Sequence, residues 1–342
     1  KFQNRVFIQY KYHFYLRDII YHLFFTVVMN SQDSFSNKKV LLIDIGGTNI
    51  RTATAEIGSN EINNASKQNL DCLDSFDQII QKLLSKDQNI KHIVFSVAGP
   101  KLHQSIAMTN RNFEINEKTI LKKFAVDSCY ILNDWESIGH GLSLFDTKEM
   151  SFINKCDGFN QTSLVIGPGT GLGAAQVIKD NIVLPTEIGN SSLTLPKLFE
   201  DFEPMAIENF NIIESIISGS GLKQIYKIFS NEEKSSEEIV SSFSNDEFSQ
   251  KAINFFLNSF SQILSELALA YMPGNGVFIA GGLMRSIHQF IDNDIFMKNF
   301  LMNRKSMHAK ILSQMPIATI NQEMTCLHGS LNFLNKIYEK HK

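Results

Sequence analysis

Short apolar runs and stretches with helical spacing alternate along most of the chain. Residues 40–45 form a continuous apolar run that ends at two glycines, and residues 51–57 then alternate apolar and polar positions with a period of two. The first pattern predicts a buried strand and the second predicts a strand that returns beside it. The two segments are therefore expected to form a hairpin.

Helix and strand patterns then follow one another. After Ser75, a possible helix cap, apolar residues recur at helical spacing, and residues 92–97 form a buried strand. A short helix around residue 120 and a strand at residues 129–132 come next. The strand runs into Asn133-Asp134 at the start of another helix, and this first domain is expected to end near residue 144.

The second half repeats the opening pattern. A strand at residues 163–166 enters a glycine-rich turn, and a second strand follows at residues 174–178. Helices are expected over residues 205–272, where the polar segment 230–244 is interpreted as a solvated connection between helices. Strands at residues 277–280 and 316–320, each followed by a helix, complete the chain. The pattern predicts an α/β protein with mixed sheets and helices outside them.

Composition narrows the classes of function. With 342 residues, 43% hydrophobic and 20% charged, the chain is long enough for about two globular domains and is not disordered as a whole. The net charge of -3 is spread along the chain, so neither nucleic acid nor an anionic membrane is an expected partner. Four scattered cysteines form no metal-binding spacing and are expected to be reduced thiols of a cytoplasmic protein: Cys72, Cys129, Cys156 and Cys326.

The first 28 residues are unusual. Basic residues precede an apolar run at residues 19–28, which is too short to span a bilayer, and no small-residue cleavage site follows. An extension, or a true start at Met29, is favoured over a targeting segment.

The first hairpin turn carries candidate phosphate-binding chemistry. Two adjacent glycines allow successive backbone N–H groups to approach phosphate oxygens, and the next two residues add donors. The aspartate before them would hold Mg²⁺ through water. An ordinary glycine hairpin, with the aspartate bound by turn amides, is the alternative. The residues are Asp44, Gly46, Gly47, Thr48 and Asn49.

The second glycine turn suggests the other side of a phosphate site. Gly169, Thr170 and Gly171 follow a strand and are able to wrap the outer phosphates. Because a strand and not a helix follows, the turn does not fit a dinucleotide-binding fingerprint, and no Walker P-loop occurs in the sequence.

Acidic residues provide candidates for catalysis and sugar binding. Asp134 is expected at the carboxyl edge of a sheet, where it would act as the general base for a hydroxyl. The alternative is a helix N-cap. Glu187 and Glu214 are candidate acceptors for sugar hydroxyls, although either alone is more typical of a surface residue.

In this order, the motifs resemble the bacterial-type glucokinase family over roughly residues 40–340. The resemblance rests on segments that include L-I-D-I-G-G-T-N-I-R at residues 42–51, G-T-G-L-G at 169–173, S-G-S-G-L at 218–222 and G-V-F-I-A-G-G at 276–282, with Met108-Thr109-Asn110 and Asn133-Asp134.

The resemblance implies a fold, ligands and residue roles. The fold would be a two-domain ribonuclease-H-like and actin-like ATPase fold with an interdomain cleft. Residues 1–37 would form an extension and linker, 38–144 with 326–342 the small domain, and 145–325 the large domain. ATP, Mg²⁺ and glucose would bind to a cytoplasmic homodimer. Asp134 would be the base, and Gly281-Gly282 would lie near adenosine. The sugar contacts would come from Asn110, Asn133, Asp134, Glu187, Asn190 and Glu214.

One departure concerns the sugar loop. This chain reads Thr186-Glu187-Ile188-Gly189-Asn190, so Asn190 replaces a histidine that the family usually has. An altered sugar preference is expected, because an amide donates and accepts hydrogen bonds differently. A kinase for another hexose or amino sugar, as in the repressor and open-reading-frame kinase family, and a non-catalytic sugar or nucleotide sensor remain alternatives.

Overall fold

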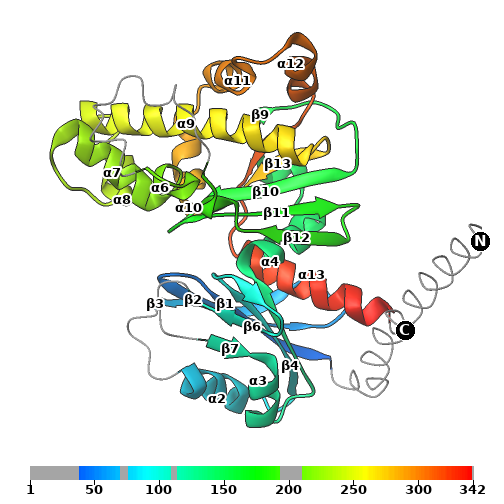
Figure 1. The fold of residues 1–342 in the computed structure, drawn as a ribbon. Helices are drawn as coiled ribbons and strands as arrows, with labels where there is room; N and C mark the ends of the chain where they lie inside the picture. Colours follow the sequence, from blue (N-terminus) through cyan, green and yellow to red (C-terminus); the bar gives the residue numbers. More distant parts are fainter. Residues whose placement is uncertain (1–37, 70–75, 109–113, 193–209, 341–342) are drawn as a thin grey trace, which may run out of the picture.

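The computed structural model describes residues 38–69, 76–108, 114–192 and 210–340, which fold into two lobes (Figure 1). Each lobe is built around one large β-sheet. The extension at residues 1–28, the possible cap Ser75 and the predicted sugar ligand Asn110 lie outside the described residues.

The sheet of the first lobe mixes antiparallel and parallel strands. Its strand order is β3-β2-β1-β4-β8, and β1 pairs antiparallel with β2 and parallel with β4. The predicted hairpin is therefore confirmed. The strands are β1 (Lys39–Ile45), β2 (Asn49–Glu56), β3 (Ile62–Asn69), β4 (Ile90–Val97) and β8 (Ser128–Asn133).

The sheet of the second lobe repeats these pairings. Its order is β12-β11-β10-β13-β14-β9, and β10 pairs antiparallel with β11 and parallel with β13. The repetition predicted from the two glycine turns is confirmed. The strands are β9 (Met150–Asn154), β10 (Thr162–Pro168), β11 (Leu172–Ile178), β12 (Ile182–Thr186), β13 (Gly276–Ile279) and β14 (Ile317–Ile320).

Helices cover the sheets, and a small third sheet lies in the first lobe. The helices α6 to α9 confirm the helical segment predicted before Pro273. The small sheet consists of β5 (Lys101–Leu102), β6 (Ser105–Ala107) and β7 (Glu114–Asn116). The outer helices are α2 (Phe76–Lys86), α3 (Glu117–Lys123), α6 (Ile213–Ile216), α7 (Gly219–Ser230), α8 (Ser236–Ser241), α9 (Glu247–Tyr271), α10 (Gly282–Ile287), α11 (Asn293–Leu301) and α12 (Ser306–Ser313).

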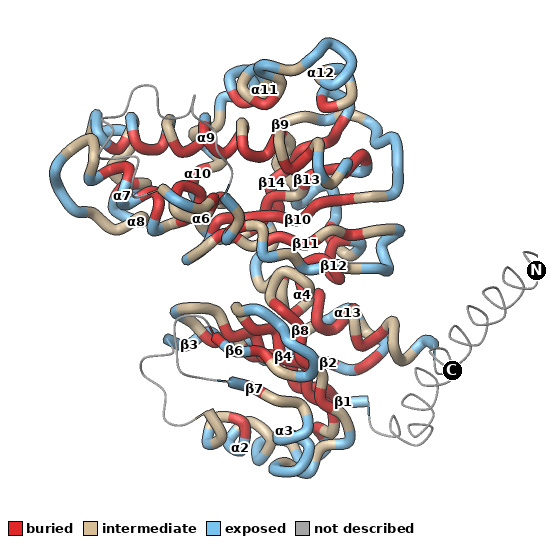
Figure 2. Tube along the Cα trace, viewed as in Figure 1, coloured by how far each residue is buried: buried red, intermediate tan, exposed pale blue. Residues whose placement is uncertain are grey.

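Two packed helices, α4 (Asp134–Gly141) and α13 (Thr325–Lys340), lie between the two large sheets (Figure 1). Leu327, Leu331 and Leu334 of α13 pack into the core of the first sheet. Ile138 in the middle of α4 and Leu142, the residue after this helix, pack into the core of the second sheet. Both helices contain buried residues, drawn in red in Figure 2. The predicted domain boundaries stay a prediction.

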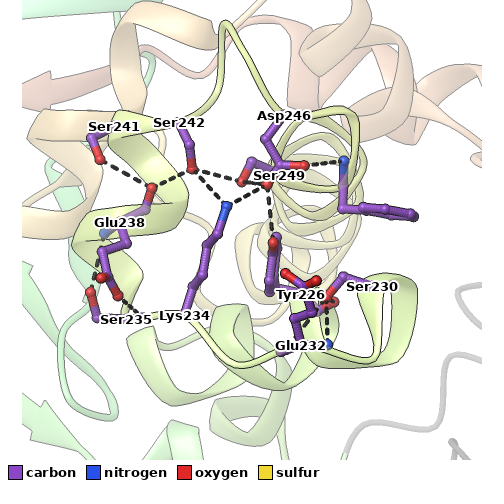
Figure 3. A network of polar contacts seen from close by, with 11 residues as sticks. Tyr226, Ser230, Glu232, Lys234, Ser235, Glu238, Ser241, Ser242, Asp246 and Ser249 are labelled. Atoms are coloured by element: carbon purple, nitrogen blue, oxygen red, sulfur yellow. Dashed lines mark hydrogen bonds and ion pairs between the residues drawn. The ribbon is translucent and has the colours of Figure 1, made fainter.

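The polar segment 230–244 connects α7 to α9 and is exposed or half-exposed except at Ile239, so the predicted solvated connection is confirmed. It contains α8 and contributes to a polar network with α7 and α9 (Figure 3). Asp246 Oδ2 accepts hydrogen bonds from Lys234 Nζ at 2.7 Å, Ser249 Oγ at 2.7 Å and Tyr226 Oη at 3.1 Å. The side chains of Lys234 and Asp246 are only 28% and 18% exposed, so this ion pair is partly shielded from water.

We expect Asp246→Asn to lower the melting temperature by a few degrees at neutral pH. Lys234 and Ser249 hold the pKa of Asp246 well below its ordinary value, so its ionised form stabilises the fold above the pKa of an unfolded aspartate. This stabilisation is lost as pH falls below that value, and the difference between variant and wild type should then shrink. Thermal unfolding at several pH values measures it. Glu233→Gln is the matched control, because Glu233 and Lys227 form an ion pair whose side chains are 79% and 59% exposed. An equal loss in both variants would contradict the expectation.

Candidate functional site

A cleft of about 760 Å³ lies between the lobes, at the ends of β1, β8 and β10. Its volume suits a small-molecule ligand. Every predicted site residue that the structure describes lines it: Asp44, Gly46, Gly47, Thr48, Asn49, Asn133, Asp134, Gly169, Thr170, Gly171, Glu187, Asn190, Glu214, Gly281 and Gly282. The fold therefore brings together residues that are far apart in the sequence.

Asp44 is buried near the end of β1 and faces a cation. Its Oδ2 atom accepts a hydrogen bond from Arg51 Nη1 at 2.8 Å, from the residue opposite it on β2. In the described part of the chain, no hydrogen bond joins its carboxylate to an amide of the turn, so the alternative of a turn cap is not supported. Burial raises the pKa of Asp44 although Arg51 opposes this effect. A carboxylate whose charge is incompletely balanced in this way suits a second cation such as Mg²⁺.

The two glycine turns meet in the cleft. A Cβ atom added to Gly47 would lie 3.1 Å from Thr170 Oγ1, so the first turn contacts the second. A Cβ atom at Gly169 would have no heavy atom within 4 Å, which shows that the second turn is open toward the cleft. The N–H of Gly46 donates to the carbonyl oxygen of Asn49 at 2.9 Å and that of Gly169 to the carbonyl oxygen of Gly171 at 2.7 Å, so the other amides of the two turns are the candidates for one polyphosphate.

Asp134 is the first residue of α4, and Asn133 is the N-cap of this helix. Asn133 Oδ1 accepts hydrogen bonds from the N–H groups of Trp135 at 2.9 Å and Glu136 at 3.3 Å. The cap predicted as an alternative role for Asp134 is therefore supplied mainly by its neighbour, although Trp135 N also donates to Asp134 Oδ1 at 3.0 Å. Burial, followed by the nearby Asp44 carboxylate, raises the pKa of Asp134 to about 7. A carboxylate tuned near neutrality is suited to general base catalysis.

We expect the activity to fall on the acid side of neutrality. Because Asp134 must be ionised to accept a proton and its pKa is about 7, log(kcat/KM) should rise with pH up to about this value and then level off. The apparent pKa belongs to the pair with Asp44. Initial rates at subsaturating substrate from about pH 5.5 to 8.5 measure it, with the coupling enzymes checked at each pH. A flat profile would contradict a base in this environment.

Three of the predicted sugar residues, Glu187, Asn190 and Glu214, line the cleft from segments of the second lobe. Glu214 Oε2 accepts a hydrogen bond from the N–H of Leu172 at 3.1 Å, which ties α6 to the second turn. Desolvation in the cleft, followed by the Glu214 carboxylate, raises the pKa of Glu187. The two carboxyl groups are therefore close enough to interact. Asn190 lies on the same short helical turn, where its N–H donates to the carbonyl oxygen of Glu187 at 3.0 Å.

Most hydrogen-bonding groups of the Asn133 side chain are already used within the protein. Its Oδ1 atom caps α4, and its Nδ2 atom donates to the carbonyl oxygen of Gly99 at 2.9 Å. One N–H of the amide is left for a ligand within the described structure.

Three cations that were not predicted as ligands also line the cleft. Arg51 and Lys67 are opposite each other on β2 and β3, and Arg285 lies on α10, shortly after Gly281-Gly282. Positive charge in the cleft that also holds both glycine turns suits an anionic ligand such as a nucleotide. A possible signal in the sequence is that Arg51 and Arg285 each follow a glycine pair by a few residues.

Known proteins are similar to this chain over most of its length. A family model described as Glucokinase matches residues 41–337. A glucokinase from Colwellia psychrerythraea is 27% identical over 90% of this chain and 99% of its own length. One from Campylobacter jejuni subsp. doylei is 29% identical over 74% of this chain and 80% of its own length.

Solved structures share the fold. A glucokinase from an Antarctic psychrotroph has a TM-score of 0.73 at 23% identity, covering 87% of this chain and 99% of its own. A glucokinase from Balamuthia mandrillaris in complex with glucose has a TM-score of 0.72 at 18% identity, covering 90% and 96%. The predicted two-domain actin-like α/β fold is confirmed. Among the described helices, none combines the length and apolar character that a bilayer span requires.

Proposed function

Because the chain belongs to the glucokinase family, we propose that it transfers the γ-phosphate of ATP to the 6-hydroxyl of glucose, with Asp134 as the general base. The observation that carries the proposal is the meeting of two glycine turns in a cleft that also holds a carboxylate with a pKa of about 7. The solved structure of a family member with glucose, and of a related kinase with glucose and AMPPNP, supports the choice of ligands.

In the proposed reaction one proton is transferred, one bond to phosphorus forms and another breaks. The carboxylate of Asp134 accepts the proton of the sugar hydroxyl as its oxygen bonds to the γ-phosphorus, and the bond from phosphorus to the leaving oxygen of ADP breaks. Backbone amides of both turns hold the phosphate oxygens. Mg²⁺, which Asp44 would hold through water, would neutralise charge on the outer phosphates. Closure of the lobes would exclude water and limit ATP hydrolysis.

A panel of hexoses assayed with ATP and Mg²⁺ tests the substrate. We expect glucose to have the highest, or second highest, kcat/KM, measured by coupled detection of ADP. Glucose outside the best two would overturn this assignment.

The sugar loop favours a second candidate. Asn190 lines the cleft where the family usually has histidine, so a kinase for mannose or an N-acetylated amino sugar is the alternative substrate class. The same panel, extended to these sugars, distinguishes the two. Glucose binding measured by calorimetry without ADP release from any sugar would instead indicate a sensor. The cytoplasmic location and the homodimer remain predictions.

A further inference from the structure

Trp135, the residue after the proposed base, is the only tryptophan of the chain. It lies on the cleft side of α4 and packs against the core of the second lobe. Gly167 and Gly173 face each other across the β10–β11 pair. A Cβ atom at Gly173 would lie 1.8 Å from Trp135 Nε1, and one at Gly167 would lie 2.7 Å from Cη2. The indole therefore occupies a slot that exists because both positions lack a side chain.

The slot indicates that Gly167 and Gly173, which lie on the strands flanking the second turn, serve the packing of the indole and not phosphate binding. Gly167 is also required by β13, because its Cβ atom would lie 1.8 Å from the carbonyl oxygen of Ala280. At Gly173 the three closest atoms all belong to Trp135. A substitution at Gly173 therefore tests the contact with the indole most directly.

The slot connects the base with the phosphate turn. β10 and β11 carry Gly169, Thr170 and Gly171 between them, whereas the indole belongs to the residue whose N–H donates to Asp134 Oδ1 at 3.0 Å. Any shift of the hairpin relative to α4 must therefore move the indole or open the slot, since packed groups do not deform freely.

We infer that Trp135 is a positioning residue that holds Asp134 in register with the phosphate turn of the other lobe. The inference rests on the proposed function. A displacement of about 1 Å between reacting groups is able to cost on the order of 10²-fold in rate. Trp135 thus acts through Asp134 and the turn, without contact with the reacting atoms.

Removing the indole should separate turnover from binding. In Trp135→Ala we expect kcat to fall roughly 10- to 100-fold, while KM for each substrate changes much less. Trp135→Phe keeps a ring in the slot and should lose less. Phe145→Leu is the matched control, since Phe145 belongs to the same core cluster, is 6% exposed and does not line the cleft. It should lower the melting temperature and keep kcat. Equal effects of the Phe145 and Trp135 variants on kcat would overturn the inference.

Gly173→Ala tests the slot from its other side. The added methyl group collides with the indole, so kcat should fall in the wild-type background. In the Trp135→Ala background the methyl group has room, and the same substitution should then cost little or restore part of kcat. Losses that add would overturn the inference. If Trp135→Ala does not fold, the cycle is run with Trp135→Phe, whose smaller ring also relieves the collision.

The fluorescence of the wild-type protein provides an independent readout. With one tryptophan, emission reports Trp135 alone, and saturating Mg·ADP should change its intensity or wavelength because the hairpin holding the indole binds the phosphates. The inference would be contradicted if emission did not change while Mg·ADP raised the melting temperature and the enzyme remained active. The proposed function would then still stand. Wild-type protein that releases no ADP with any hexose would contradict the proposed function, and the inference with it.

Discussion

Asp134→Asn is expected to lower kcat by roughly 10²- to 10⁴-fold and to raise the melting temperature above neutral pH. The first effect follows from the loss of the only proposed proton acceptor. The second follows from burial, which raises the pKa of Asp134 from an ordinary value of 3.8 to about 7. Between these values the folded state binds more protons than the unfolded state, so stability falls as pH rises through this window. An asparagine removes that loss.

Two measurements on the same variant separate these effects. Steady-state kinetics at saturating substrates give kcat, and thermal unfolding at about pH 8 and about pH 4 gives stability, where the gain should be largest at the higher pH. Asp146→Asn is a matched control, because Asp146 caps a short helix outside the cleft by accepting a hydrogen bond from Lys148 N at 2.9 Å. Turnover near the wild-type value in Asp134→Asn would remove Asp134 from the mechanism.

Gly329→Ala should cost about 1–3 kcal/mol of stability, or more. A Cβ atom at Gly329 would lie 1.6 Å from the carbonyl oxygen of Ser137, where α13 crosses α4. This neighbour is backbone, so no side-chain rotation relieves the collision and the helices must separate. On an isolated helix the same change would be favourable by up to about 1 kcal/mol, which makes a loss diagnostic of the crossing.

Denaturant unfolding measures this loss. Ser330→Ala, one residue along the same helix, removes a buried hydroxyl that lies 3.4 Å from Ser137 Oγ and adds no atoms. Ser330→Ala should lower the free energy of unfolding by only about 1 kcal/mol. If Gly329→Ala were as stable as the wild type, the close crossing of the two helices would be refuted.

Elements with a strong local signal were predicted well. β1, β4 and β10 are apolar runs with buried residues, and the two predicted glycine turns follow β1 and β10. β3 was missed because nearly all of its residues are exposed and its sequence has no alternation of apolar positions. β12 was missed because it is a short edge strand interrupted by Pro185, which argues against a strand in the sequence. The segment 230–244 is a solvated connection as predicted, but its ion pair with Asp246 was not foreseen because a polar sequence does not reveal which charges pair with each other.

The sequence by itself determined which residues are chemically able to bind phosphate or to accept a proton. The glycine turns follow apolar strands, and Asp134 follows a third strand. These local features depend on only a few neighbouring residues and not on how the lobes are arranged. The tertiary structure alone decided the raised pKa of Asp134 and the contact of Gly329 with α4. It also showed that Gly173, the last residue of the G-T-G-L-G segment, makes room for Trp135. These properties depend on distances between segments far apart in the chain, and only the packing of the sheets against α4 and α13 sets those distances.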